Sequence, residues 1–523
     1  MSANQKQVSA RGMIILLISL INIIVLRSAY ISGGKGYWIL LITLPLLFIA
    51  LYNIKQRKHA LLKNYPLIGY LRYWLEAIRP EMRQYFFESD LDGKPFNRRQ
   101  RSIVYQRSKN EKQTVAFGMQ ADPAAVGNEW AAHSMYPVNL EQKDLRVLIG
   151  SSQCSQPYEC SIYNIGAMSY GALSKTAIQA LNEGAKLGGF AHNTGEGGIS
   201  DYHLKGGDLI WQIGTGYFGC RDEQGNFSEK EFKKNVLRPE VKMIELKISQ
   251  GAKPGHGGIL PAAKNTPEIA LIRGVTAGTT VASPPAHTAF TNAVGMINFL
   301  GRLRDLSGGK PVGFKLCIGD KKVFIDICHA ITTLNILPDF ISIDGSEGGT
   351  GAAPLEFTDN LGMPLHEALA FVTKALRAYE LKKEIKIIAA GKIVTGFDIL
   401  KALALGADAC YSSRGMMLSL GCIQALQCDS GKCPVGIATQ NPKLYKALDI
   451  TDKYVRIASF HTNTIKATKE IMEACGFEST GDIPANKFFK KIDATRTKSF
   501  EDIYLKNNDP LLPKWQNQFF VLN

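Results

Sequence analysis

The chain begins with two apolar runs that contain no charged side chain. They cover residues 13–26 (MIILLISLINIIVL) and 37–52 (YWILLITLPLLFIALY), and a short SGGKG segment lies between them. A helix that spans a bilayer needs about 20 apolar residues, and both runs approach that length once their uncharged flanks are included. We therefore expect a transmembrane helical hairpin over residues 1–54. A signal peptide or a buried soluble hairpin is the alternative, although no A-x-A-like cleavage site follows the first run.

Charged residues beside these runs predict which way the hairpin faces. Lys6 and Arg11 precede the first run, KQRKH follows the second, and residues 1–120 hold 18 Lys/Arg against six Asp/Glu. Positive charge collects on the cytoplasmic side of membrane proteins, so we expect a two-helix membrane protein whose remaining chain is cytoplasmic. Residues 55–149 would form a basic juxtamembrane linker along anionic headgroups. Nucleic acid is not expected as a partner, because no DNA- or RNA-binding motif accompanies the charge.

Beyond residue 150, short apolar runs alternate with helical stretches and glycine-rich turns. Eight such units predict a (β/α)8 TIM barrel, an α/β fold, over residues 150–480, followed by a C-terminal extension over 481–523. A doubly wound sheet is the alternative. Plausible helices follow most of the expected strands, as at 175–187 and 398–405. The expected strands are 161–169, 189–193, 243–249, 280–285, 312–318, 340–346, 385–392 and 409–413.

Polar residues at the carboxyl ends of these strands are candidate site residues, because barrel enzymes build their active sites there. They are Ser169, Asn193, Lys247, Lys315, Asp344 and Arg414. The seventh and eighth units carry AAGKIVTG and SSRG, at the usual place for a phosphate held by backbone amides, so a phosphorylated cofactor is expected. GTGYFG (214–219) matches a dinucleotide fingerprint literally, but no clear strand precedes it and no helix opens from it, so we expect no dinucleotide fold there.

Three of the ten cysteines lie close together in the stretch CIQALQCDSGKCPVG. Cys422, Cys428 and Cys433 have the spacing C-x5-C-x4-C, which fits neither a zinc ribbon nor a C-x-x-C redox site. Three ligands suit an iron–sulfur cluster that lacks one iron, since a four-iron cluster normally takes four cysteines; three ordinary buried thiols are the alternative. Ten cysteines in a chain of 523 residues do not indicate a disulfide scaffold. We regard Cys154 and Cys160, which repeat the C-x5-C spacing, as ordinary thiols.

Six ordered motifs resemble the FMN-binding synthase domain of glutamate synthase, over about residues 150–480. The motifs are AMSYGALS (167–174), NTGEGG (193–198), ISQGAKPGHGGILP (248–261), SPPAH (283–287), GSEGGTGAAP (345–354) and GCIQALQCDSGKCPVGIATQ (421–440). The resemblance implies a TIM barrel with FMN and a 3Fe-4S cluster, which condenses ammonia with 2-oxoglutarate and reduces the imine to L-glutamate. The hairpin and linker lie outside the resemblance and suggest a membrane-tethered branch of the family.

The resemblance also implies roles for individual residues. The backbone at Ala167, Met168 and Ser169 would pack on the flavin, and Lys315 would face its N1/O2 edge. Lys253 and Arg273 would bind the two carboxylates of 2-oxoglutarate, and Glu196 would relay protons or order its loop. The cluster ligands would be Cys422, Cys428 and Cys433. Around the FMN phosphate we expect Gly348, Gly349, Thr350, Gly391, Arg414 and Gly415.

Two departures from the family pattern concern the substrate loop. His256 and Ile259 stand where the family motif KPGEGGQLP has Glu and a substrate-binding Gln. A different hydroxy, keto or amino acid substrate, turned over by an FMN-dependent dehydrogenase or oxidase, is therefore one alternative. A membrane-anchored flavin and cluster electron carrier without synthase activity is another. The chain shows no amidotransferase domain and no NAD(P)H-oxidising part, so we expect free ammonia or another subunit as the nitrogen source, and ferredoxin or a reductase as the electron donor.

Overall fold

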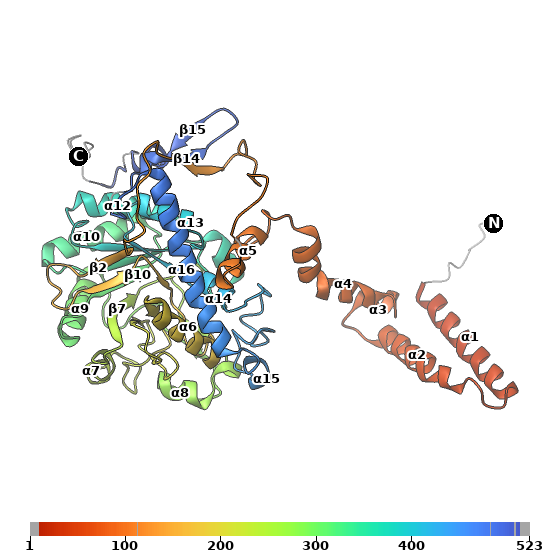
Figure 1. Cartoon of the computed structure of the whole chain (residues 1–523). Coiled ribbons are helices and arrows are strands. Elements are labelled where there is room, and N and C mark those ends of the chain that lie inside the picture. Colours follow the sequence, from red (N-terminus) through yellow and green to blue (C-terminus); the bar gives the residue numbers. More distant parts are fainter. Residues whose placement is uncertain (1–9, 112, 482, 507–508, 513–523) are drawn as a thin grey trace, which may run out of the picture. The chain divides into compact units, whose positions relative to one another are not determined.

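The computed structural model describes residues 10–111, 113–481, 483–506 and 509–512. It divides the chain into two compact units, Met1–Gly93 and Lys94–Asn523 (Figure 1). The division falls inside the segment 55–149 that the sequence presents as one basic linker. Lys6, one of the charges that flank the first apolar run, lies outside the described residues.

The first unit contains the two apolar helices, α1 (Ala10–Ile31) and α2 (Leu40–Lys55), joined through the short 3-10 helix η1 (Tyr37–Ile39). Both are long and apolar enough to cross a membrane. They pack on each other, and Thr43 Oγ1 donates a hydrogen bond of 2.8 Å to Asn22 Oδ1. Asn22 is only 4% exposed. Polar side chains within apolar helices need such partners when no water is available.

Short helices complete the first unit. They are α3 (Ala60–Asn64), α4 (Gly69–Met82) and the π-helical turn η2 (Arg83–Phe87). The buried Asn53 at the end of α2 ties this part to the hairpin, because its Nδ2 donates to the carbonyl of Pro66 at 2.6 Å and its Oδ1 accepts from Tyr70 at 3.1 Å. These bonds hold the chain that leaves the hairpin against its second helix.

The second unit is built on a closed barrel of eight parallel strands, as expected from the sequence. The strands are neighbours in chain order, and the barrel closes where the eighth strand pairs with the first, at Cys410↔Tyr163 for example. They are β4 (Tyr163–Ile165), β5 (His192–Asn193), β6 (Leu209–Ile213), β7 (Val241–Lys247), β10 (Val312–Leu316), β11 (Phe340–Asp344), β12 (Lys386–Ala390) and β13 (Ala409–Ser412).

One expected strand was wrong and one real strand was not recognised. Residues 280–285 do not enter the barrel: Val281–Ala282 (β9) pairs with Ile259–Leu260 (β8) in a separate two-stranded sheet, and the prolines that follow have no amide hydrogen to donate to a ladder. The missing barrel strand is β6, whose five residues LIWQI are all buried. It ends directly before GTGYFG, so the statement that no clear strand precedes that stretch was also wrong.

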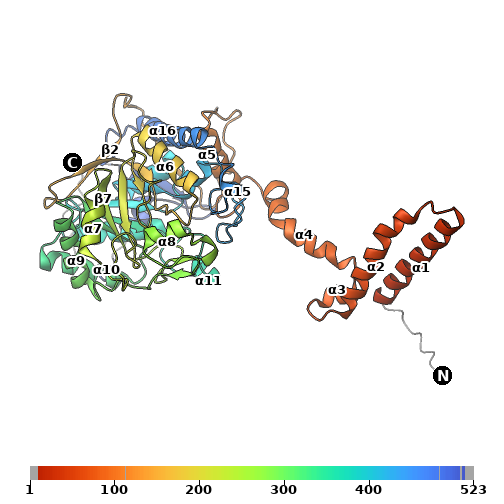
Figure 2. The ribbon, with the colours of Figure 1, turned by 90° about the horizontal axis from the view of Figure 1, so that it is seen from below.

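Helices surround the barrel on its outside (Figures 1 and 2). The expected helices at 175–187 and 398–405 correspond to α6 and α13. The long helix α16 packs against both of them. Residues 194–208, between β5 and β6, form no helix. The helices are α6 (Lys175–Gly188), α7 (Glu229–Val236), α8 (Pro267–Arg273), α9 (Ala293–Leu306), α10 (Lys321–Leu334), α11 (Leu355–Asn360), α12 (Leu365–Ala378), α13 (Gly396–Ala404), α14 (Arg414–Ser419), α15 (Pro442–Tyr445) and α16 (Ile450–Cys475), with the 3-10 turn η3 (Ala262–Lys264).

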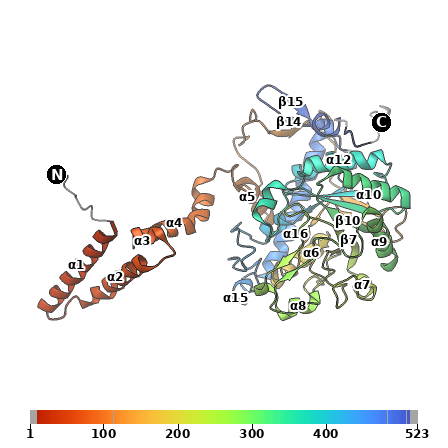
Figure 3. The same ribbon diagram turned by 180° about the vertical axis from the view of Figure 1, so that it is seen from behind.

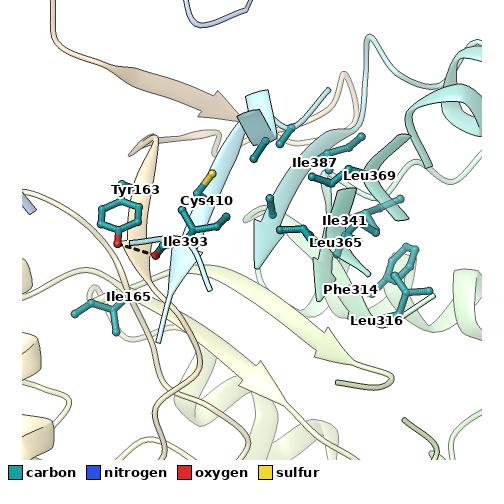
Figure 4. Packing of buried hydrophobic residues seen from close by; sticks show 14 of the residues in the cluster. Tyr163, Ile165, Phe314, Leu316, Ile341, Leu365, Leu369, Ile387, Ile393 and Cys410 are labelled. Atoms are coloured by element: carbon teal, nitrogen blue, oxygen red, sulfur yellow. Dashed lines mark hydrogen bonds between the residues drawn. The ribbon is translucent and has the colours of Figure 1, made fainter. Parts of the chain in front are cut away.

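The core lies between the strands and these helices (Figure 4). Phe314, Ile341 and Ile387 on three neighbouring strands are fully buried, and Leu365 and Leu369 of α12 are buried in the same cluster. Burying side chains of this size stabilises the fold by about 1.5–3 kcal/mol each. The barrel interior is less apolar. There Glu245 of β7 is fully buried and accepts hydrogen bonds from three other strands, donated by Asn193, Gln212 and Ser342.

Smaller elements close the ends of the unit. The hairpin β2 (Arg146–Ile149) and β3 (Tyr158–Ser161) packs on the barrel through Ile149 and Cys160. Helix α5 (Arg98–Ser108) packs on α14 and α16, as Figure 3 shows from behind. Part of the expected C-terminal extension forms a sheet with an earlier segment. This sheet consists of β1 (Glu129–Ala131), β14 (Phe488–Lys491) and β15 (Thr497–Ser499), flanked by η4 (Ala485–Lys487) and η5 (Glu501–Leu505).

The packing of α16 on α6 gives a test of this arrangement. A Cβ added at Gly184 of α6 would lie 2.8 Å from Cβ of Ile457 and 2.9 Å from the carbonyl oxygen of Tyr454. Alanine is the better helix former by about 1 kcal/mol, so G184A would stabilise an unpacked helix. We expect instead a loss of about 1–3 kcal/mol from overpacking, measured as a lower unfolding midpoint. G319A, where a Cβ meets nothing within 4 Å, is the control. A stabilised G184A protein would contradict the packing.

Candidate active site

A cavity of about 340 Å³ opens at the carboxyl ends of the barrel strands. This volume lies within the usual range for small-molecule sites. The cavity brings together every predicted site residue except Asn193, Cys422 and Cys433. Those in its wall are Ala167, Met168, Ser169, Glu196, Lys247, Lys253, Arg273, Lys315, Asp344, Gly348, Gly349, Thr350, Gly391, Arg414, Gly415 and Cys428.

The segment after β4 forms a rigid wall of this cavity. The amide of Met168 donates to the carbonyl of Asn193 at 3.0 Å, and Nε2 of the buried His203 lies 3.1 Å from the Met168 carbonyl. Gly195 packs so closely that an added Cβ would lie 2.8 Å from the amide nitrogen of Ser169, and its φ of +64° is one that glycine adopts readily. Backbone fixed in this way can lie flat against a planar ligand.

Lys315 places a permanent positive charge in the middle of the cavity. Its Nζ lies 3.4 Å from Oδ2 of Asp344, and both side chains are nearly buried. Burial alone would lower the pKa of Lys315, but Asp344 and Glu245 outweigh it and raise the pKa above its ordinary value. Asp344 also accepts a hydrogen bond of 3.0 Å from the amide of Gly251, which fixes its orientation. Lys315 is therefore a protonated, pre-oriented cation.

Arg414 begins α14 and lies beside the glycine-rich loop after β11. An added Cβ at Gly349 would come 2.7 Å from its Cζ, so only glycine leaves room for the guanidinium there. Nη2 donates to the carbonyl of Glu347 at 2.5 Å, and Cζ lies 5.0 Å from the ring centre of Phe96. Burial lowers the pKa of Arg414, although arginine stays charged in proteins. A fixed guanidinium and exposed loop amides suit a phosphate group.

Glu196 is the carboxylate at the other end of the cavity. Its Oε1 lies 2.9 Å from Nζ of Lys247. Two glycines leave room for it, since an added Cβ would lie 2.5 Å from Oε2 at Gly214 and 2.6 Å from Oε1 at Gly258. The glycine that opens GTGYFG thus admits a carboxylate. Burial would raise the pKa of Glu196, but Lys247 and two further cations, Lys253 and Arg273, lower it below its ordinary value.

Lys253 and Arg273 are both buried cations without a carboxylate in ion-pair contact in the described part of the chain. Lys253 is 2% exposed, and its Nζ donates to the carbonyl of Gly257 at 2.8 Å. Arg273 is 5% exposed and donates to the carbonyl of Tyr170, while its Nε has no hydrogen-bond partner among the described residues. Burial lowers the pKa of Lys253 and lowers that of Arg273 to about 10. Both sites would be completed by an anion.

The net charge of the cavity wall also indicates a negatively charged ligand. Seven cationic side chains and three carboxylates line it. An excess of buried positive charge is costly unless anions balance it. The cavity is therefore built for a ligand, or a pair of ligands, with several negative charges.

The two residues that depart from the family pattern occupy different places. Ile259 lines the cavity with a side chain that is 40% exposed. His256 is not among the lining residues: its Nδ1 lies 3.0 Å from the Gly257 carbonyl, and its ring meets Phe357 edge-on at 5.8 Å. Histidine at this position therefore supports its own loop, whereas isoleucine presents an apolar surface to the ligand.

The three clustered cysteines are free thiols in the same corner of the unit. No three His, Cys, Asp or Glu side chains converge on one point as ligands of a single ion within the described ranges; a cluster with several irons would not require this, because each thiolate binds a different iron. Burial and the two neighbouring thiols raise the pKa of Cys422 to about 11, and Lys264 Nζ donates to the carbonyl of Cys428 at 2.6 Å. Three thiols beside a buried lysine suit an anionic group.

Sequence reasoning missed several residues of the cavity wall. Gln212 belongs to β6, and the uninterrupted apolar run LIWQI between glycines was the signal that could have found it. Lys392, which follows β12 in the stretch AAGKIVTG, was not predicted as a site residue. Neither was Lys264, which lies on η3. Phe96 comes from a segment far away in the sequence, and no local pattern marked it.

The fold and the cavity define a TIM-barrel protein with a cavity rich in positive charge at the carboxyl ends of its strands. Residues 125–478 match the conserved region in glutamate synthase. A glutamate synthase large subunit-like protein, YerD, of Bacillus subtilis is 38% identical over 502 residues, which cover 87% of this chain and 94% of that protein.

Two further relatives match a smaller share of the chain. The archaeal glutamate synthase [NADPH] of Methanocaldococcus jannaschii is 36% identical over 62% of this chain and 60% of its own length. The glutamate synthase [NADPH] large chain of Bacillus subtilis is 31% identical over 61% of this chain and 20% of its own length. The chain therefore belongs to the glutamate synthase family. It is an oxidoreductase of the glutamate synthase type, in the class that acts on CH–NH2 donors.

The ion pair of Glu196 gives a pH-dependent prediction. Its folded pKa lies below the ordinary value of 4.5, so its charge contributes stability that is fully present above that value and is lost as the pH falls through the folded pKa. We expect E196Q to lower the free energy of unfolding by about 1–3 kcal/mol at pH 7, and the difference from wild type to shrink in acid. Urea unfolding across pH measures it. E223Q, at an exposed carboxylate, is the control, and a difference independent of pH would contradict the pairing.

Proposed function

We propose that this protein is an FMN- and iron–sulfur-dependent oxidoreductase that reduces the imine of 2-oxoglutarate and ammonia to L-glutamate. The observation that carries the proposal is the single cavity described above. Its wall combines a glycine loop with Arg414, then Lys315, then Lys253 with Arg273. Lys315 lies between the other two groups, because it interacts with Asp344, which also acts on Arg414, and with Glu196, which also acts on Lys253 and Arg273. These are the charges that a flavin phosphate, a flavin ring and a dicarboxylate would require, in that order.

FMN fits the residues at the first end of the cavity. Gly348, Gly349 and Thr350 would offer amides to the phosphate, and Arg414 would add a charge-assisted fork. Gly391 and Gly415 would leave room for its approach. The backbone of residues 167–169 would support the ring, and Lys315 would stabilise negative charge at its N1/O2 edge. When bound and reduced, FMN would supply the hydride.

The substrate would be held by residues at the opposite end. Lys253 and Arg273 would each take one carboxylate of 2-oxoglutarate, because separated cations orient a dicarboxylate and fix which carbon faces the flavin wall. Glu196 and Lys247 form a hydrogen-bonded pair that can pass a proton between Oε1 and Nζ. We assign to this pair the proton that leaves ammonium and the proton needed when water is lost, since general acid–base groups act through such short contacts.

Cys422, Cys428 and Cys433 would hold a 3Fe-4S cluster beside the cavity. Cys428 itself lines the cavity wall, so the cluster would stand next to the flavin. It would supply single electrons from an external donor such as ferredoxin or a reductase. Ammonia would arrive free or from another subunit.

The hairpin would tether the enzyme to a membrane. Its exposed apolar side chains support this, since Leu16 and Leu41 are 71% and 78% exposed, which water would penalise and lipid would not. The basic flanks favour a cytoplasmic barrel.

A second candidate substrate follows from Ile259. An apolar side chain at this wall cannot donate a hydrogen bond to a carboxylate, so a keto acid or hydroxy acid with a less polar chain would fit there better. The flavin, cluster and proton-transfer residues would serve such a substrate without change, as a dehydrogenase or oxidase.

Substrate turnover tests the proposal directly. Anaerobically purified protein should carry flavin and broad iron–sulfur absorption, and the dithionite-reduced protein should be reoxidised by 2-oxoglutarate plus ammonium with formation of glutamate. K253A and R273A should each slow this reoxidation by at least tenfold, because a lost charge-assisted contact costs about 1.5–3 kcal/mol, and both should retain FMN.

The control for these two variants is K233A, at an exposed lysine of α7, which should reoxidise at the wild-type rate. If the wild-type flavin stays reduced with 2-oxoglutarate but is reoxidised by a less polar keto acid, the second candidate is correct. A preparation with neither flavin nor iron would refute both.

Membrane insertion is tested on the full chain. Arginine at the centre of a spanning helix costs about 3 kcal/mol relative to leucine, so L20R in α1 should move protein from the carbonate-resistant membrane fraction to the soluble fraction. L187R introduces the same change at an exposed position of α6 in the barrel, 59% exposed, and should leave fractionation unchanged. Equal fractionation of L20R and wild type would argue against a spanning hairpin.

A further inference from the structure

Helix α5 buries an arginine where its packing predicts an apolar residue. The buried positions of this helix are Arg101, Val104 and Ser108, which lie on one face. Arg101 is only 5% exposed, and its Nε and Nη2 have no hydrogen-bond partner in the part of the chain that the structure describes. Two exposed arginines, Arg98 and Arg99, stand on the same helix. The buried arginine is therefore not explained by the basic character of the segment.

A buried guanidinium group without a partner lowers the stability of the folded protein. Taking a cation out of water costs several kcal/mol unless an anion or a full set of hydrogen bonds replaces the water, and well-packed apolar residues are usually no worse than a buried ion. Nearly all buried polar groups of folded proteins find a partner. Arg101 thus indicates that an anion belongs beside it which is not an acidic side chain of the described chain.

Helix α5 meets the cysteine loop on the side that carries Arg101. Arg101 and Tyr105 are four residues apart on this helix, so their side chains are neighbours on its surface. One turn further along α5, Tyr105 Oη donates a hydrogen bond of 2.7 Å to the carbonyl of Cys422. The guanidinium and the first cysteine of the proposed cluster therefore lie at the same junction between α5 and the loop.

A second clamp fixes this junction from the other side. The side chain of Gln424 accepts a hydrogen bond of 3.0 Å from the amide of Phe96, and it donates to the carbonyls of Phe96 and Lys94 at 3.1 and 3.4 Å. The hydrogen bonds at Cys422 and at Gln424 together fix the position of the cysteine loop relative to α5 and to the residues that precede it. A cation held in this way is pre-oriented toward whatever the loop binds.

We propose that Arg101 is the resident counter-charge of the iron–sulfur site, donating its free N–H groups toward the sulfur atoms and raising the reduction potential of the cluster. It is a positioning and tuning residue, and this inference rests on the proposed function, because it requires a cluster at Cys422, Cys428 and Cys433. When the cluster gains one electron its negative charge increases by one, and a fixed cation stabilises that state. Net charge and hydrogen bonds to sulfur are the levers by which proteins set such potentials.

Redox titration of the full-length protein tests the proposal without relying on turnover. R101M removes the charge and keeps a long apolar side chain, R101K keeps the charge, and R99M removes an exposed arginine from the same helix. Each is titrated anaerobically, with the oxidised cluster followed by EPR and the flavin by absorbance. At the wild-type midpoint, R101M should show an oxidised-to-reduced cluster ratio about tenfold higher, a shift of about 59 mV for one electron. R101K and R99M should stay within about twofold of wild type.

The other outcomes are also decisive. A ratio within twofold of wild type in iron-loaded R101M, or an equal shift in R99M, would overturn the proposal. If R101M retains FMN but holds no iron, R101K decides: an iron-loaded R101K supports the counter-charge, and an iron-free R101K overturns it in favour of a packing role. Wild-type protein without iron and sulfide would refute the proposed cluster, and with it this inference, whereas an unchanged R101M potential overturns the inference alone.

Discussion

The open end of the barrel holds more buried positive charge than its own carboxylates balance. Lysines and arginines from several loops converge on one cavity, and among its few acids Glu196 stands between three of them. Such an arrangement costs solvation energy in the empty protein. The cost is offset only when anions occupy the cavity, so part of the binding energy for an anionic ligand comes from the way the protein folds.

Glycines make this concentration of charge sterically possible. Glu196 lies against Gly214 and Gly258, and Arg414 lies against Gly349, at distances that any Cβ would obstruct. The eight parallel strands supply the other requirement, because their carboxyl ends meet in one ring and bring residues from distant segments together. The strands fix the backbone from which each charged side chain extends. The buried cations are therefore held apart from one another although they are poorly solvated.

Much of this could be predicted from the sequence, and the exceptions have physical causes. The glycine motifs and the cations of the cavity could be predicted because each belongs to a short, continuous sequence motif. The strand β6 was missed and residues 280–285 were taken instead, because β-branched residues resemble a strand whether or not they are buried, and burial decides. Trp211 and Gln212 are buried, whereas every residue of the later segment is exposed or only half-buried. Contacts such as Phe96 with Gln424, 328 residues apart, leave no trace in local pattern.

Helix α5 has a practical consequence for anyone who wishes to study the barrel without its apolar hairpin. A chain shortened to the family's conserved region would begin at residue 125 and would contain every motif, yet it would lose the ring that lies against Arg414 and would uncover the sides of α14 and α16. A division after Gly93, where the compact units separate, keeps that helix in place. The conserved region of the family and the segment that folds as one body are therefore not the same length in this protein.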